Sequence, residues 1–154
     1  MKREIIFIVL IVFLLQGCAQ TNQNSSTAGE LRTNQSIAAP VEKIEVYHFH
    51  GTNQCYSCKT VGAYAEETVN TYFADELKSG KIVFAHINGE LPENRDKVIQ
   101  YGATGSSLWI GVYDSSGFHK EENVNVWYKI NNKDDYLLYL RGIINKRLKG
   151  DYSQ

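Results

Sequence analysis

The sequence predicts an α/β domain in which a central mixed β-sheet is flanked by helices. Short segments rich in β-branched and aromatic residues end at turn residues, as strands do. Between them, apolar residues recur every three or four positions, as on one face of a helix. The order of these segments is β-α-β-α-β-β-α, which implies parallel pairing with right-handed crossovers and an antiparallel pair at one edge of the sheet.

The first strand and the first helix are predicted by a change of period. Residues 43–50, Lys-Ile-Glu-Val-Tyr-His-Phe-His, have the composition of a strand that ends at Gly51. From Cys55 the apolar residues follow helical spacing, and Gly80 is the expected residue after the helix C-terminus. The apolar face of this helix consists of Val61, Tyr64, Ala65, Val69, Tyr72, Phe73 and Leu77.

The middle of the domain is predicted from its turn residues. Residues 81–88 form the second strand. Pro92 opens a short helix and Gly102 closes it, which matches the preference for proline at the start and glycine past the end. Residues 107–113 form the third strand, and the turn at 114–117 leads into an antiparallel partner strand.

A final helix is predicted near the C-terminus. Asp134 or Asp135 can cap its first turn. Its apolar residues are Leu137, Leu138, Leu140, Ile143, Ile144 and Leu148. No internal repeat interrupts the domain.

The first seventeen residues resemble a bacterial lipoprotein signal peptide. A basic Lys2-Arg3 pair precedes an apolar run at 5–15, which is too short for a permanent membrane span of about 20 residues. Leu15-Gln16-Gly17-Cys18 then has the form of a lipobox. We therefore expect a signal peptide over 1–17 and lipidation of Cys18, whose acyl chains would hold the protein on a membrane.

Residues 18–41 are expected to form a flexible tether. They are rich in Asn, Gln, Ser and Thr, and they cannot bury enough apolar surface to offset their ordering entropy. Residues 42–154 then form one domain of ordinary size. No Asp follows Cys18, which by the bacterial sorting rule favours the outer membrane. The expected location is the cell envelope, facing the periplasm.

Cys55-Tyr56-Ser57-Cys58 lies between the first strand and the first helix. The free amides and partial positive charge of a helix N-terminus stabilise a thiolate, and thiols in such CxxC motifs have pKa values of roughly 3.5–7.5. We expect Cys55 to be the exposed nucleophile and Cys58 to resolve the mixed disulfide by attacking Cys55. Because lipidation of Cys18 leaves only this pair, an oxidising compartment favours a working pair over a structural disulfide.

A CxxC motif that opens the helix after the first strand is the thioredoxin arrangement. The sequence therefore predicts a thioredoxin-like fold and a membrane-tethered thiol-disulfide oxidoreductase. Its expected partners are exported proteins of the cell envelope that carry thiols or disulfides, and no cofactor is expected. The net charge of −1 and the lack of a basic stripe give no support for nucleic-acid binding.

Metal binding remains open as an alternative function. Thioredoxins carry a cis-proline before their third strand, which shields the thiols from metal, and Ser107 stands in its place. His48 and His50 alternate onto the same side of their strand, and one imidazole could join the two thiols in a Cu(I) or Zn(II) site. The simpler interpretation is that one ring packs in the sheet and the other lies near the surface, so no metal ligand is assigned. His86 on the second strand is a further candidate ligand, and His119 lies in the hairpin; the simpler interpretation of both is that they are ordinary.

The sequence also resembles a known family. Val46-Tyr47-His48-Phe49-His50-Gly51-Thr52 followed by the CxxC motif, and later Tyr101-Gly102 with Gly105-x-x-Leu108, are similar to the thioredoxin-like ArsF family. The resemblance covers roughly residues 44–148. The family is described as subunits of nitrophenyl-compound nitroreductases. The resemblance implies the thioredoxin-like fold, the Cys55–Cys58 pair as the site, and electron delivery as the activity.

Overall fold

The structure is a computed structural model that describes residues 40–153. The expected signal peptide, Cys18 and residues 18–39 of the expected tether lie outside the described residues. The elements are β1 (Val41–His50), α1 (Tyr56–Tyr72), α2 (Ala74–Ser79), β2 (Ile82–Asn88), the 3-10 turn η1 (Pro92–Asn94), α3 (Arg95–Tyr101), β3 (Ser107–Asp114), β4 (Gly117–Glu122), the 3-10 turn η2 (Val124–Lys129) and α4 (Lys133–Leu148). Between residues 40 and 153, no helix has the length and apolar character that crossing a membrane requires.

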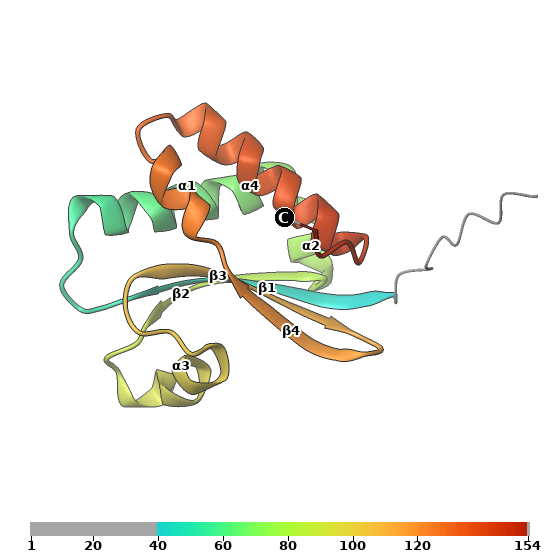
Figure 1. Cartoon of the computed structure of the whole chain (residues 1–154), viewed down its shortest axis with the longest axis horizontal. Coiled ribbons are helices and arrows are strands. Elements are labelled where there is room, and N and C mark those ends of the chain that lie inside the picture. Colours follow the sequence, from blue (N-terminus) through green and yellow to red (C-terminus); the bar gives the residue numbers. More distant parts are fainter. Residues whose placement is uncertain (1–39, 154) are drawn as a thin grey trace, which may run out of the picture. The chain divides into compact units, whose positions relative to one another are not determined.

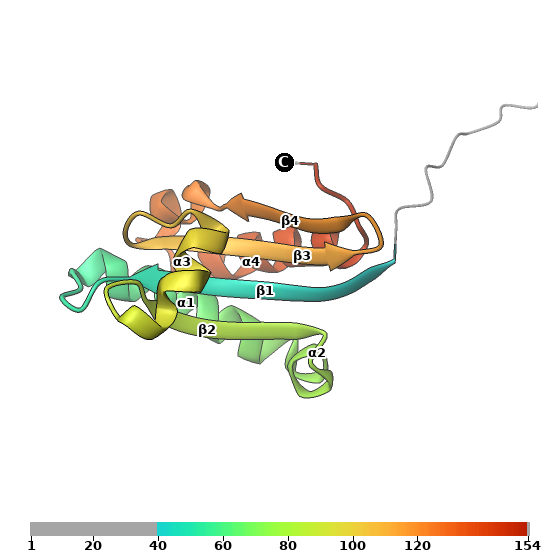
Figure 2. The ribbon, with the colours of Figure 1, turned by 90° about the horizontal axis from the view of Figure 1, so that it is seen from below.

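The four strands form one mixed sheet in the order β2-β1-β3-β4. β1 is parallel to β2 and antiparallel to β3, and β3 is antiparallel to β4. Helices α1 and α4 cover one face of the sheet, and α3 covers the other (Figure 1). Figure 2 shows the sheet from the α3 side, with β1 and β3 as the inner strands. The predicted α/β class, with a mixed sheet flanked by helices, is confirmed. The expectation that antiparallel pairing is confined to one edge is wrong, because the two inner strands β1 and β3 are also antiparallel.

Alternation along β1 divides the apolar side chains between two cores. Ile44 and Val46 belong to the larger core, which includes Val61 and Val69 of α1 and side chains of α4. Tyr47 and Phe49 point to the other face and pack with Tyr101 of α3 in a smaller, aromatic core. The strand is therefore buried on both faces, which explains why it has an almost continuous run of apolar and aromatic residues.

The predicted first helix is in fact two helices. Phe73 leaves the helical conformation with φ −136° and ψ 32°, which ends α1, and α2 begins at Ala74. The Phe73 side chain is buried in the larger core, and Leu77 of α2 packs against the same core. Because the apolar spacing continues across the break, periodicity alone did not reveal it.

The boundaries of two further elements differ from the prediction. β1 begins at Val41, which is buried and pairs with Asp114, so the sheet starts two residues earlier than expected. The N-cap of α4 is Asn132, not Asp134 or Asp135, because its side-chain Oδ1 accepts the Asp135 backbone N–H at 3.2 Å. The expected apolar face of α4 is otherwise correct except at Leu138, which is 58% exposed.

Two glycine-to-alanine replacements are expected to change stability in opposite directions. A Cβ at Gly111 of β3 would lie 2.8 Å from Phe118 Cε2 and 2.9 Å from Tyr101 Cζ. Gly111→Ala should therefore lower the free energy of unfolding by about 2 kcal/mol. Gly142 of α4 has open space at its Cβ position, so Gly142→Ala should raise it by about 0.5–1 kcal/mol. Urea denaturation of both variants measures these changes, and equal shifts in the two would contradict the packing argument.

Candidate functional site

The two cysteines of the CxxC motif form a disulfide at the N-terminus of α1. Cys55 is the N-cap residue, and its Sγ accepts the Cys58 backbone N–H at 3.1 Å. The two Cα atoms are 5.1 Å apart. Cys55 is exposed and Cys58 is half-buried. These exposures agree with the expectation that Cys55 is the more accessible of the two cysteines.

The residue after Cys55 exposes an aromatic ring. Tyr56 is 83% exposed, although a tyrosine ring carries a large apolar area. Tyr56 is the first residue of α1 and follows Cys55 directly in the chain, so its ring is exposed beside the motif. Tyrosine is enriched where proteins bind one another, so Tyr56 is a candidate contact residue.

His48 lies directly beneath the helix that carries Cys58. Its side chain is buried, with 1% of the residue exposed, on the face of β1 covered by α1. Gly62, one turn after Cys58, leaves room for the ring, because a Cβ there would stand 2.6 Å from His48 Cε1. The Nε2 atom of His48 is buried and has no hydrogen-bond partner among the described residues.

His48 is joined to the surface through a second histidine. Its Nδ1 lies 3.0 Å from Nδ1 of His86, the residue opposite it on the parallel strand β2. His86 Nε2 lies 3.2 Å from Glu66 Oε2 on α1. The side chains of His86 and Glu66 are 38% and 51% exposed. A continuous polar path therefore runs from beneath Cys58 to solvent.

The surroundings of His48 favour its neutral form. Burial lowers the pKa of His48 to about 4, with smaller contributions from the nearby His86 and His50, and an interaction with the Cys58 backbone opposes them. His50 stacks on His48 with ring centroids 5.4 Å apart, and its Nδ1 hydrogen-bonds to the Gly51 carbonyl at 2.9 Å. Both histidines thus share one side of β1, as the alternation predicts.

His119 lies at the other end of the sheet. It follows the β3–β4 turn, where its Nε2 contacts Ser116 Oγ at 2.8 Å and Asp114 Oδ1 at 3.3 Å. Asp114 pairs with Val41, at the end of β1 remote from the cysteines. The structure therefore does not bring His119 to the thiol pair.

Ser107, at the position of the expected cis-proline, is built into the sheet. It is buried at the start of β3 and lies opposite Phe49 of β1. Its hydroxyl donates to the Gly105 carbonyl at 3.1 Å and accepts the Trp109 Nε1–H at 3.0 Å. These bonds fix the end of the loop that precedes β3.

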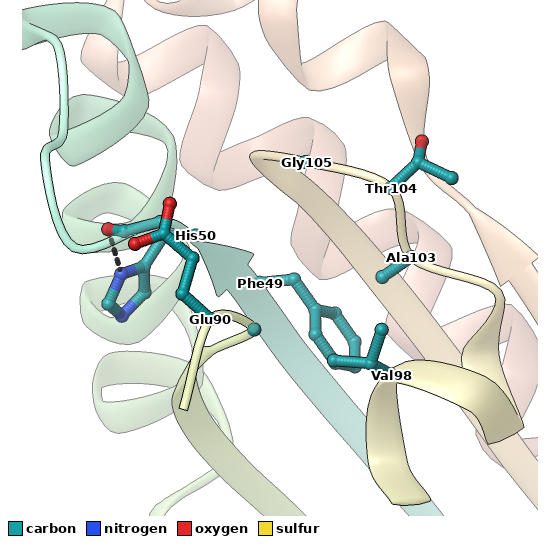
Figure 3. Close-up of a pocket in the computed structure, with 9 residues that line it drawn as sticks. Phe49, His50, Glu90, Val98, Ala103, Thr104 and Gly105 are labelled. Carbon is teal, nitrogen blue, oxygen red and sulfur yellow. Dashed lines mark hydrogen bonds between the residues drawn. The ribbon is translucent and has the colours of Figure 1, made fainter. Parts of the chain in front are cut away.

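A pocket of about 180 Å³ lies at the same end of the sheet as the cysteines. It is formed by the end of β1, the loops after β2 and before β3, and one residue of α3 (Figure 3). Phe49, Val98 and Ala103 give it an apolar wall. Glu90 lies on the opposite side, where its Oε2 accepts the Thr52 N–H at 3.0 Å. Hydrogen bonds from Thr52 lower the pKa of Glu90, so the pocket carries a carboxylate.

The pocket and the cysteines share a connection. Gly51 lines the pocket, and the loop that begins there reaches Cys55 within four residues. The pocket was not expected from the sequence, because its lining residues come from two separate parts of the chain, 49–51 and 89–105.

The metal-binding alternative has no supporting arrangement in residues 40–153. No group of three His, Cys, Asp or Glu side chains there is placed to hold a metal ion. Neither protein-family models nor curated proteins match the sequence.

The contact between the His48 and His86 rings was not predicted from the sequence, which favoured an ordinary role for His86. A signal was nevertheless present, because each histidine lies near the end of a predicted strand and the two strands were expected to be parallel. Aligning the ends of the two strands would have placed the rings side by side. Glu66 gave no such signal, since a carboxylate on a helix is most often solvated.

Proposed function

We propose that the protein is a membrane-tethered thiol-disulfide oxidoreductase with a thioredoxin-like fold. The main observation in support of this proposal is the disulfide between Cys55 and Cys58 at the N-terminus of α1, which follows the central strand β1. The sheet order β2-β1-β3-β4, with two helices on one face and one on the other, supports the fold assignment. The exposures of the two cysteines support exchange with other proteins, because Cys55 is exposed and Cys58 is half-buried.

In the reduced protein the Cys55 thiolate attacks a disulfide of the partner. One partner sulfur leaves as a thiolate, and Cys55 is joined to the other in a mixed disulfide. Cys58 then attacks the Cys55 sulfur, which forms the Cys55–Cys58 bond and releases the second partner thiol. Two electrons pass to the partner, and the same steps in reverse oxidise a partner dithiol.

Partner recognition is assigned to the surface around Cys55. The exposed Tyr56 ring and the pocket lined by Phe49 and Glu90 both lie next to the loop that carries the cysteine. An extended segment of a partner can contact the ring and place a side chain in the pocket while its sulfur reaches Cys55. No cofactor is needed for this chemistry.

The cellular setting is part of the same proposal. We assign the protein to the cell envelope, held by a lipid on Cys18 at the outer membrane and exchanging electrons with exported proteins. Membership of the ArsF family is included in the proposal, with electron delivery to a partner as the shared activity.

A trapping experiment tests the exchange. With Cys58→Ser the mixed disulfide on Cys55 cannot be resolved, so covalent complexes with envelope proteins should accumulate and disappear on addition of dithiothreitol. Cys55→Ser is the matched control and should trap nothing, because it lacks the exposed nucleophile. Diagonal electrophoresis of envelope extracts, non-reducing and then reducing, measures the complexes. Absence of complexes with Cys58→Ser, together with a Cys55–Cys58 disulfide that dithiothreitol does not reduce, would reject the proposal.

A further inference from the structure

We infer that the pocket lined by Phe49 and Glu90 binds a lysine or arginine side chain of the partner protein, close in sequence to the partner cysteine. This inference rests on the proposed thiol-disulfide exchange and names the side chain that the pocket selects. The pocket combines an apolar wall with a carboxylate. A basic side chain has the complementary pattern, because an apolar stem carries its positive charge at the end.

The apolar wall suits the stem of a long side chain. Phe49, Val98 and Ala103 form this wall, and they come from β1, α3 and the loop before β3 (Figure 3). The volume of about 180 Å³ is far larger than the roughly 15 Å³ that one ordered water needs. The pocket therefore has room for several methylene groups, and their removal from water favours binding.

The carboxylate of Glu90 is held in place by the loop that leads to the cysteines. Its Oε2 accepts the Thr52 backbone N–H at 3.0 Å. The Thr52 hydroxyl accepts an N–H of the Asn88 side chain at 3.0 Å, and Asn88 Oδ1 accepts the Glu90 backbone N–H at 3.1 Å. Gly51 leaves room for the carboxylate, since a Cβ there would lie 2.7 Å from Glu90 Oε1. A carboxylate positioned before binding loses less conformational freedom when it pairs with a cation.

The pocket supplies no permanent positive charge to neutralise Glu90. None of the nine lining residues, all of which lie in the described part of the chain, is lysine or arginine. The other lining residue that can titrate is His50, whose Nδ1 hydrogen-bonds to a backbone carbonyl. By contrast, Glu121 on β4 is paired with Arg147 at 2.6 Å. The carboxylate of Glu90 is therefore available to a cation from a partner.

The position of the pocket limits where the basic residue can lie in the partner. Gly51 lines the pocket and is four residues before Cys55, so their Cα atoms are at most about 14 Å apart. An extended partner segment rises about 3.3 Å per residue. We therefore expect the basic residue within about four positions of the partner cysteine, and a charge farther away should have little effect.

Synthetic peptides that contain one cysteine test this inference. Each peptide carries 5-thio-2-nitrobenzoate on its cysteine through a disulfide bond. A lysine, norleucine or glutamate residue is placed one to four positions from the cysteine, or about eight positions away as a distant control. The Cys55 thiolate of the reduced full-length protein attacks the peptide sulfur, which breaks this disulfide, forms a peptide–Cys55 disulfide and releases the coloured thiolate. Cys58 then attacks Cys55 and releases the peptide thiol.

Stopped-flow absorbance of the coloured thiolate gives a rate constant for each peptide. The natural protein should react about fivefold faster with lysine than with norleucine at the best near position, as expected for a partly exposed ion pair. Glutamate should be slower than norleucine. The distant lysine should give a ratio close to one, and about 0.5 M sodium chloride should reduce the near-position ratio.

Glu90→Gln is the central variant, because glutamine keeps an oxygen for the Thr52 N–H but carries no charge. Its ratio of lysine to norleucine rates should fall to about one. Glu93→Gln is the matched control, since it removes the same charge from an exposed residue outside the pocket, and it should keep the ratio of the natural protein. Thermal unfolding establishes that both variants are folded.

Equal rates with lysine and norleucine at every near position would overturn the inference. The same ratio in Glu90→Gln as in the natural protein would overturn it as well. An equal fall of the ratio in both variants, or a ratio that does not depend on the position of the lysine, would indicate diffuse attraction and would also reject the pocket. A natural protein that releases no coloured thiolate from any peptide would instead contradict the proposed exchange itself.

Discussion

Acidification from pH 5 to pH 2 is expected to remove about 3 kcal/mol of stability through one carboxylate, Glu45. Burial raises the pKa of this residue, but hydrogen bonds from Lys43 and Tyr101 and the charge of Lys97 outweigh it and lower the pKa to about 2. The ordinary pKa of a glutamate side chain is 4.5, so this contribution to stability is nearly complete above pH 4.5 and is lost as the pH falls toward 2.

The contacts explain why Glu45 remains ionised although it is only 3% exposed. Its Oε2 accepts the hydroxyl of Tyr101 at 2.8 Å and that of Tyr113 at 3.1 Å. Lys43 Nζ lies 2.8 Å from Oε1, and Lys97 Nζ lies 3.4 Å from Oε2. The carboxylate thus joins β1 to β3 and α3 on the face opposite the cysteines.

Glu45→Gln isolates this contribution, because glutamine does not ionise. The difference in unfolding free energy between the natural protein and the variant should be constant above pH 5 and shrink by about 3 kcal/mol toward pH 2. Glu42→Gln on the same strand is the matched control, since Glu42 is exposed. Urea denaturation at stepped pH measures the difference. If it stays constant throughout, the carboxylate is not held ionised by these contacts.

Arg147→Met is expected to lower the free energy of unfolding by about 3 kcal/mol. Arg147 is 1% exposed and binds Glu121 through two bonds of 2.6 and 2.8 Å. Its Nη1 also donates to the carbonyls of Asp151 and Ser153 at 2.6 and 3.1 Å. Methionine keeps most of the apolar stem but leaves these acceptors without their donor. Because the Glu121 side chain is 24% exposed, water recovers part of the loss, so we expect the lower end of the range for a broken buried pair.

Arg141→Met on the same helix provides the comparison for Arg147→Met. Arg141 is exposed, and its guanidinium lies 4.7 Å from the Tyr72 ring centroid. Its replacement should cost less than about 1 kcal/mol. Urea denaturation of both variants, with m-values compared, gives the two losses. Similar losses would show that removal of any arginine from α4 has this effect.

Most of the helices and strands were predictable because residues close together in the sequence determine them. The run of β-branched and aromatic residues before Gly51, the proline and glycine around α3, and the turn at 114–117 each act within a few residues. The break at Phe73 was not predictable, because that side chain satisfies the helical spacing whether or not its backbone is helical. The cap at Asn132 depends on which of several neighbouring polar side chains meets a free amide, and spacing does not decide this.

The candidate site was predictable to a smaller extent. The pairing of Cys55 with Cys58 and the greater exposure of Cys55 follow from the place of the motif at the start of a helix. The contact between His48 and His86 depends on strand register, which is set by packing across the whole sheet. The hydrogen bonds of Ser107 reach only Gly105 and Trp109, two residues away on either side, but no residue pattern shows that the loop before β3 brings these groups together. The pocket beside Phe49 joins the end of β1 to loops near residues 89–105, and no local pattern determines how those loops lie.

The pairing of β1 with β3 also governs the order in which the domain can be assembled during synthesis. Phe49 pairs with Ser107 and Val41 pairs with Asp114, so the central strand gains its antiparallel neighbour only after the chain has emerged through residue 114. Non-local pairing of this kind folds more slowly than local contacts form, whereas a loop of about ten residues closes in roughly 10–100 ns. Cys55 and Cys58 can therefore meet each other, or an oxidant, well before the sheet that buries His48 is complete. The two thiols can therefore react before the domain has folded, and the redox state of the newly made chain depends on its compartment and not on the folded site.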